Sequence, residues 1–204
     1  MARQTKEKAR ETREKILDAA SCVFFEKGVA GAGLEEIAER AGVTRGAVYW
    51  HFKNKIDLFE ALHDALHEPF LATILENIET DHPEPLVQLQ DLCVELLNDL
   101  ATNERKQRAL TIFFIKCDYT GDTAPLLRKQ EQQNANIHRL FERYFERALK
   151  RCPAADACNA KCLATGLLCY LTGIAEQFLR YPGHLDLKKQ SRQLMHQFFQ
   201  GTGL

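Results

Sequence analysis

The sequence predicts an all-α protein, because helical periodicity runs through the chain and strand signals are missing. Residues 12–27 carry apolar side chains at the i, i+4, i+7 spacing of one helix face, and similar patterns recur towards the C-terminus. No stretch alternates β-branched and polar residues between turn signals. Glycine and proline clusters divide the pattern, so we expect about nine helices and no sheet.

The first two expected helices end at glycines. Gly28 follows the apolar stripe of residues 12–27 and supplies a stop for that helix. A second, shorter stripe covers residues 34–41 and is followed by Gly42. Both glycines fit the left-handed conformation in which many helices end.

The next two helices are expected to start at capping residues. Thr44 is a preferred N-cap for a short helix that runs to about Phe52. Asn54 caps a fourth helix and has Asp57 three positions later. We expect Pro69 to kink or restart this helix, because proline removes a backbone donor.

The rest of the chain divides at proline and glycine clusters. We expect helical segments at residues 89–100, 104–117, 134–148, 156–180 and 187–199, separated by breaks at 81–85, 121–125, 152–153 and 181–183.

Charge differs between the two ends of the chain. Residues 1–55 hold eleven Lys and Arg against eight Asp and Glu, although the whole chain has a net charge of −1. The remainder is therefore acidic. A basic DNA-binding domain at 1–55 joined to a second domain at 56–204 fits this asymmetry.

The N-terminus and the cysteines indicate the cellular compartment in which we expect the protein. The opening residues are charged and precede no apolar signal segment, and no run of about 18 apolar residues predicts a membrane span. The seven cysteines are then expected to be reduced thiols. We expect a cytoplasmic protein without membrane contacts.

Residues 34–51 fit a helix-turn-helix. Gly42 permits the tight turn, Val43 anchors the corner, and Thr44 caps the second helix, which would lie in a DNA major groove. Arg45 suits bidentate contact with guanine. The expected DNA contacts are Thr44, Arg45, Gly46, Tyr49, Trp50, His51, Lys53 and Lys55, with Arg3, Lys6 and Arg13 of a basic N-terminal arm.

The stretch from Ile16 to Leu62 resembles the N-terminal domain of the tetracycline-repressor (TetR) family, and the segments FFIKCDYTGD and HLDLKKQSR resemble its AcrR-type multidrug-efflux repressors. The resemblance implies a homodimer that binds palindromic operator DNA upstream of efflux genes and releases it when a small hydrophobic inducer binds. It also implies that Thr44, Arg45, Gly46, Tyr49, His51 and Lys55 contact DNA. One departure is Gly33, where the family has a Ser or Thr hydroxyl.

The resemblance implies a ligand pocket between helices of residues 66–150 and a dimer interface on the last two helices. Apolar side chains with a few polar groups suit such a pocket. The candidate ligand-binding residues are Phe70, Thr111, Phe114, Cys117, Asn134, His138 and Phe141. The candidate dimer residues are Leu163, Gly166, Tyr170, Gly173, Phe178, Leu194 and Phe198.

Other interpretations stay open at this point. Cys152, Cys158 and Cys162 are close enough in sequence for a zinc site or thiol switch, although their spacing is not a standard zinc pattern. A ligand-independent architectural DNA binder would use the same N-terminal domain. The motifs of phosphate loops and of common hydrolases are missing, so we expect no enzyme, no cofactor and no resident metal.

Overall fold

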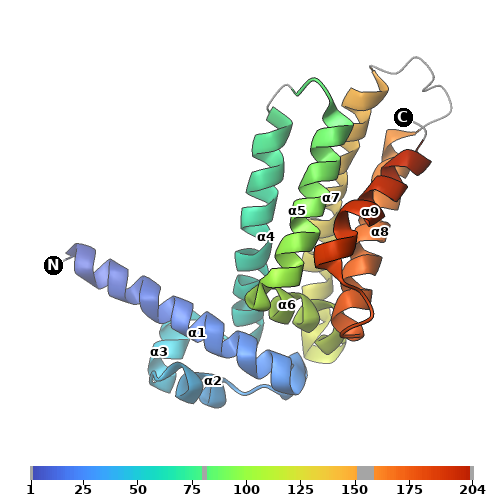
Figure 1. Ribbon diagram of the computed structural model, residues 1–204. Coiled ribbons are helices and arrows are strands. Elements are labelled where there is room, and N and C mark those ends of the chain that lie inside the picture. Colours follow the sequence, from blue (N-terminus) through green and yellow to red (C-terminus); the bar gives the residue numbers. More distant parts are fainter. Residues whose placement is uncertain (1, 80–81, 151–158, 203–204) are drawn as a thin grey trace. The chain divides into compact units, whose positions relative to one another are not determined.

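The computed structural model describes residues 2–79, 82–150 and 159–202, and within these the side chains of Arg3 and Phe70 lie outside the described residues. This part of the chain is all-helical, as predicted. Its helices are α1 (Ala2–Gly31), α2 (Leu34–Ala41), α3 (Arg45–His51), α4 (Lys55–Glu79), α5 (Pro85–Thr102), α6 (Glu104–Thr111), α7 (Ala124–Leu149), α8 (Ala160–Arg180) and α9 (Leu187–Gly201) (Figure 1). A π-helical turn at Ile112–Lys116 and a 3-10 turn at Gly121–Thr123 join α6 to α7.

The helices form two compact units. The first contains the chain as far as Leu66 together with Arg108–Lys129, and the second contains His67–Gln107 and Gln130 onwards. The chain passes from one unit to the other within α4, α6 and α7. The predicted division between residues 55 and 56 stays a prediction.

The core of the first unit is built on one face of α1. Ile16, Val23 and Phe24 are fully buried there, and burial begins at Ile16. Fully or almost fully buried apolar side chains from the other elements complete this core: Ile37 of α2, Val48 of α3, Leu58 and Phe59 of α4, and Phe113 of the π-helical turn. The hydrophobic effect therefore fixes α2 and α3 on α1.

Two glycines end helical segments as predicted. Gly28 interrupts α1 with φ 73°, and a Cβ atom there would lie 3.3 Å from the carbonyl oxygen of Lys116. Gly42 ends α2 with φ 67°, and its N–H donates to carbonyl groups of α2. Left-handed backbone favours glycine at both positions.

The start of α4 confirms the predicted cap. The Asn54 side chain accepts a hydrogen bond from the Asp57 N–H at 2.9 Å, and the Asp57 carboxylate accepts one from the Lys53 N–H at 2.9 Å. These bonds satisfy donors that a helix start leaves open. Pro69 does not end the helix, which continues to Glu79. Of the two alternatives expected at Pro69, the restart is therefore wrong, because proline costs the helix one backbone bond without stopping it, and the kink stays a prediction.

In the second unit, α9 packs along α5, and α7 and α8 complete the bundle. Phe145 of α7 stacks on Phe199 of α9 with ring centroids 6.3 Å apart. Ser191 of α9 is buried and donates to the Asn98 side chain of α5 at 2.9 Å. Apolar packing and this polar bond together set how α9 lies on α5.

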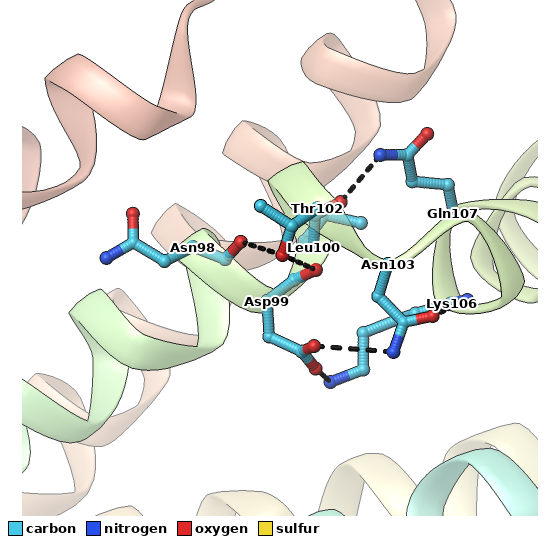
Figure 2. Close-up of polar contacts among 7 residues, drawn as sticks. All are labelled: Asn98, Asp99, Leu100, Thr102, Asn103, Lys106 and Gln107. Carbon is cyan, nitrogen blue, oxygen red and sulfur yellow. Dashed lines mark hydrogen bonds and ion pairs between the residues drawn. The ribbon is translucent and has the colours of Figure 1, made fainter.

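A polar corner sets the direction of α6 after α5 (Figure 2). Asn103 lies between the two helices, and its side chain accepts from the Lys106 N–H at 3.1 Å, so it caps α6. Asp99 forms an ion pair with Lys106, and Gln107 donates to the Leu100 carbonyl at 2.9 Å. Lys106 lowers the pKa of Asp99, so the corner keeps its charge pair at neutral pH.

Candidate nucleic-acid interface

The helix-turn-helix forms where the sequence predicts it. Thr44 has extended backbone and its hydroxyl oxygen accepts from the Ala47 N–H at 3.1 Å, which caps α3. The same hydroxyl keeps its proton for an outside acceptor. Gly33 caps α2 without a side-chain bond, as its missing hydroxyl predicts.

The short helix α3 divides cleanly into an inner and an outer face. Val48 is fully buried, and Phe52, which follows the helix, is 2% exposed. Tyr49 is 46% and Trp50 73% exposed, although both are large aromatic side chains. Large exposed aromatic groups on a helix held by a buried anchor indicate a binding surface.

Arg45 is held in place by its neighbours on this surface. Its guanidinium forms an ion pair with Glu35 of α2 and donates to the Tyr49 hydroxyl at 3.4 Å. It also lies 5.5 Å from the centre of the Tyr49 ring. The Tyr49 hydroxyl and the Glu35 carboxylate raise the pKa of Arg45. Arg45 is thus a permanent, oriented cation at the start of α3.

Glu35 is a functional neighbour that the sequence reasoning missed. It is ten residues from Arg45 and across the turn, so no helical spacing connects the two. Two further ion pairs hold α2 on α1, with Lys27 Nζ 2.8 Å from Glu36 and Arg40 Nη1 2.7 Å from Glu26. Opposite charges on neighbouring helices are the sequence signal that could have predicted these ion pairs.

Arg13 of α1 joins the C-terminal end of α3. Its guanidinium carbon lies 5.2 Å from the centre of the Phe52 ring. Burial, with a smaller effect from the charge of Arg13, lowers the pKa of His51. Trp50 and His51 meet edge to face with ring centroids 4.5 Å apart. The predicted contact residues of α3 and Arg13 therefore lie together in one region.

Lys55 has an unexpected role in the free chain. Its ammonium donates to the carbonyl oxygens of Ala30 at 2.7 Å and Ala32 at 3.3 Å, so it ties the start of α4 to the end of α1 and the loop that follows. Its predicted contact with a phosphate stays a prediction. Lys53 and Gly46 are exposed, as a DNA contact requires, and so is Lys6 on α1. The side chain of Arg3 lies outside the described residues.

The predicted ligand-binding residues are divided between the two units. Thr111 and Cys117 are buried and Phe114 is half-buried in the first unit. In the second unit Phe141 is fully buried and Asn134 is exposed, while His138 Nε2 lies 2.9 Å from the Thr165 hydroxyl of α8. The side chain of Phe70 lies outside the described residues. A ligand site made by these residues stays a prediction.

The predicted dimer residues are all incompletely buried within the single chain: Leu163, Gly166, Tyr170, Gly173, Phe178, Leu194 and Phe198. Tyr170 stacks on Phe198 at 5.3 Å and donates to the Leu194 carbonyl at 3.2 Å, which joins α8 to α9. By length and composition alone α8 is apolar enough to cross a membrane, yet 22% of its most apolar stretch is buried. Most of this stretch is therefore not covered by the part of the chain that the structure describes.

The cysteines of the alternative sensor hypothesis are only partly covered by the described residues. Cys152 and Cys158 lie outside them, and Cys162 is exposed on α8. Within the described ranges no three His, Cys, Asp or Glu side chains gather as a metal site. Cys93 is deeply buried, and burial raises the pKa of its thiol. It therefore behaves as a small apolar side chain.

Comparison with known proteins identifies the family to which the chain belongs. Residues 16–62 match the model of the bacterial regulatory proteins of the TetR family, and residues 84–202 match the MAATS-type transcriptional repressor C-terminal region. The chain is 37% identical over 197 residues to the HTH-type transcriptional regulator AcrR of Shigella flexneri, covering 94% of this chain and 89% of AcrR.

Solved structures agree with the sequence comparison. NalD, the secondary repressor of the MexAB-OprM multidrug efflux pump in Pseudomonas aeruginosa, superposes with a TM-score of 0.85 at 33% identity, over 95% of this chain and 96% of NalD. The complex of SmeT with triclosan superposes with a TM-score of 0.82 at 29% identity, over 94% of this chain and 91% of SmeT. SmeT is the repressor of the Stenotrophomonas maltophilia multidrug efflux pump SmeDEF.

The matches cover both ends of the chain, and the N-terminal match contains the whole helix-turn-helix. The family consists of transcriptional regulators that bind operator DNA and small ligands, not of enzymes. The chain therefore belongs to the TetR family, with a MAATS-type C-terminal region.

Proposed function

We propose that this protein is a cytoplasmic homodimeric repressor of a multidrug efflux operon, which leaves its palindromic operator when a hydrophobic or aromatic small molecule binds. The exposed, oriented surface of α3 carries this proposal, because Arg45 and Tyr49 are displayed there above a buried Val48. The similarity to AcrR, NalD and SmeT supports the efflux target.

On DNA, α3 lies in the major groove. Arg45 exchanges its exposed ion pair with Glu35 for a guanine, at small cost because exposed ion pairs contribute little stability. Thr44 donates its hydroxyl proton to a phosphate while its oxygen still caps α3. The other proposed contacts are Gly46, Tyr49, Trp50, His51, Lys53 and Lys55 of the helix-turn-helix, and Arg3, Lys6 and Arg13 of α1.

The dimer forms on α8 and α9. Small exposed residues follow one face of α8 at helical spacing, namely Cys162, Gly166, Cys169 and Gly173. A Cβ atom on Gly173 would meet nothing within 4 Å in the chain, so this face has space for a second helix. A symmetric copy of the same face buries it on both sides. For a palindromic operator, we propose that the two copies of α3 in this dimer bind half-sites about one DNA turn, roughly 34 Å, or a multiple apart.

Release acts through α4. This helix starts beside α3 at the Asn54 cap and continues into the second unit, so a change at either end reaches the other along one continuous helix. Thr111, Phe114, Cys117, Asn134, His138 and Phe141, with Phe70, are the proposed ligand contacts. A typical allosteric coupling of about 1–3 kcal/mol would weaken operator binding roughly 5–150-fold.

The experiment is a binding titration with the DNA directly upstream of the protein's own gene, against a scrambled fragment of the same length. We expect preferential binding to the upstream DNA. Addition of triclosan should weaken that binding roughly 5–150-fold. Triclosan is the probe because it is bound in the SmeT structure. Equal affinity for both fragments would contradict the repressor function, and saturable triclosan binding with unchanged DNA affinity would contradict ligand release.

A further inference from the structure

Residues 6–15 of α1 contribute no buried side chain to the core. Residues 6–15 are exposed or partly exposed, and burial begins only at Ile16. The helix nevertheless continues without a break from Ala2 to Gly28, and Figure 1 shows it extending beyond α2 and α3. An exposed helical extension of this length needs a reason other than core packing, because short isolated helices are marginal in water.

Its charges are sorted by face. Lys6, Arg10 and Arg13 have the i, i+4, i+7 spacing of one helix face, and we name them the basic stripe of α1. Lys8 and Lys15 each lie two positions from a member of the stripe, which places them about 200° around the helix. The chain therefore contains a basic face and two lysines elsewhere on the same helix that serve as a matched comparison.

The basic stripe is continuous with the helix-turn-helix surface. Arg13, its C-terminal member, lies over the ring of Phe52 at 5.2 Å, where α3 ends. From there the stripe continues along α1 away from the core. DNA bound by α3 would therefore meet a further line of positive charge on the same side of the first unit.

Acidic neighbours do not neutralise this face strongly. Arg10 lies 3.6 Å from Glu7 and 3.8 Å from Glu14, and all three side chains are at least 60% exposed. Such exposed ion pairs contribute little net stability, so a phosphate can replace them at little cost.

We propose that the basic stripe of α1 binds the phosphates of DNA flanking the segment read by α3. This inference rests on the proposed function and adds to it a position on the DNA. Seven residues separate Lys6 from Arg13, about 10 Å of helix, which corresponds to about 3 bp at roughly 3.4 Å each. The start of α1 at Ala2 extends the limit to about 5 bp.

The test measures operator affinity as the flanks are shortened. Upstream DNA that the protein protects in a footprint is trimmed symmetrically, starting from about 10 bp outside the inverted repeat. The wild-type protein is compared with Lys6→Ala/Arg10→Ala and with the control Lys8→Ala/Lys15→Ala, which removes the same charge. The four substituted side chains are all exposed, so circular dichroism should show unchanged folding.

We expect wild type and control to lose affinity when the flank is trimmed into the about 3–5 bp next to the segment that α3 reads. The stripe variant, Lys6→Ala/Arg10→Ala, should be insensitive to that removal. The salt slope of the stripe variant should fall by about 0.9 for each phosphate that it no longer binds. Parallel loss in all three proteins, or equal salt slopes for the two double variants, would overturn the inference. Failure of the wild type to prefer its upstream DNA would instead overturn the proposed function.

Discussion

The surface of α3 and the exposed face of α8 differ in two respects: whether a charged side chain is held in place, and how much open space lies above the helix. On α3, Arg45 is already held by Glu35 and Tyr49, so the cation is oriented before DNA arrives. On α8, Gly166 and Gly173 are exposed, and open space surrounds Gly173. If the two proposed roles hold, the DNA surface has its cation positioned before binding, whereas the dimer surface offers small residues and room for packing.

The largest expected effect comes from placing charge on the α8 face. Gly173→Glu should disrupt the dimer, because the carboxylate would be buried against the second copy, and operator affinity should fall by about 10³-fold or more towards non-specific binding. The single chain should stay folded, since Glu is a better helix former than Gly. Analytical ultracentrifugation and a DNA titration measure the two effects.

A matched control is Ala135→Glu, which adds the same charge to an exposed small residue of α7. We expect it to leave the dimer intact. A dimeric Gly173→Glu variant with full operator affinity would mean that α8 is not the interface.

The second effect is on the DNA surface. Arg45→Ala should weaken operator binding by about 1–3 kcal/mol per half-site, because alanine cannot make the bidentate bond to guanine, and should leave the dimer unchanged. Binding to operator variants altered at one position measures the loss of discrimination. If Arg45→Ala discriminates as well as the wild type, the guanidinium does not read a base.

The third effect is a pH dependence of DNA binding through His51. Burial lowers the pKa of His51 in the free chain, so around the ordinary histidine pKa of about 6.5 its ring carries less charge than an ordinary histidine does. A nearby phosphate would raise that pKa, so binding takes up a proton and affinity should increase as pH falls through this region. His51→Gln should remove this part of the pH dependence, and an unchanged profile would place His51 away from the phosphates.

The same shift affects stability with the opposite sign. Because the folded chain holds the proton less tightly than the unfolded chain, the free energy of unfolding should decrease as pH falls below about 6.5. Chemical denaturation of wild type and His51→Gln between pH values on either side of that point separates this effect from DNA binding.

The smallest effect concerns Gly33. Its φ of −110° suits any residue, and a Cβ atom there would meet nothing within 4 Å. Gly33→Thr should stabilise α2 by a few tenths of a kcal/mol and steepen the salt slope of DNA binding by about 0.9 for each additional phosphate bound. An unchanged salt slope would show that this position does not face the DNA backbone.

The sequence predicted best where one residue type meets a local backbone requirement. The Thr44 and Asn54 caps and the left-handed Gly28 and Gly42 were all predicted correctly, because each depends on neighbours a few residues away.

The contacts that were missed join residues distant in sequence. Glu35 meets Arg45 across the turn, and Lys55 donates to the Ala30 and Ala32 carbonyls more than twenty residues away. Backbone acceptors carry no residue signature, so no pattern marks them. The π-helical turn at Ile112–Lys116 was likewise hidden within a segment that sequence periodicity assigned to one helix.

The central claim is that α3 of a dimer reads specific DNA, and Trp50 reports on it directly. It is the single tryptophan of the chain, and it is 73% exposed on α3. Titrating the upstream DNA should change its fluorescence, with saturation at two chains per operator site, and the scrambled fragment should produce the change only at much higher concentration. An identical response to both fragments, or saturation at one chain per site, would contradict the account.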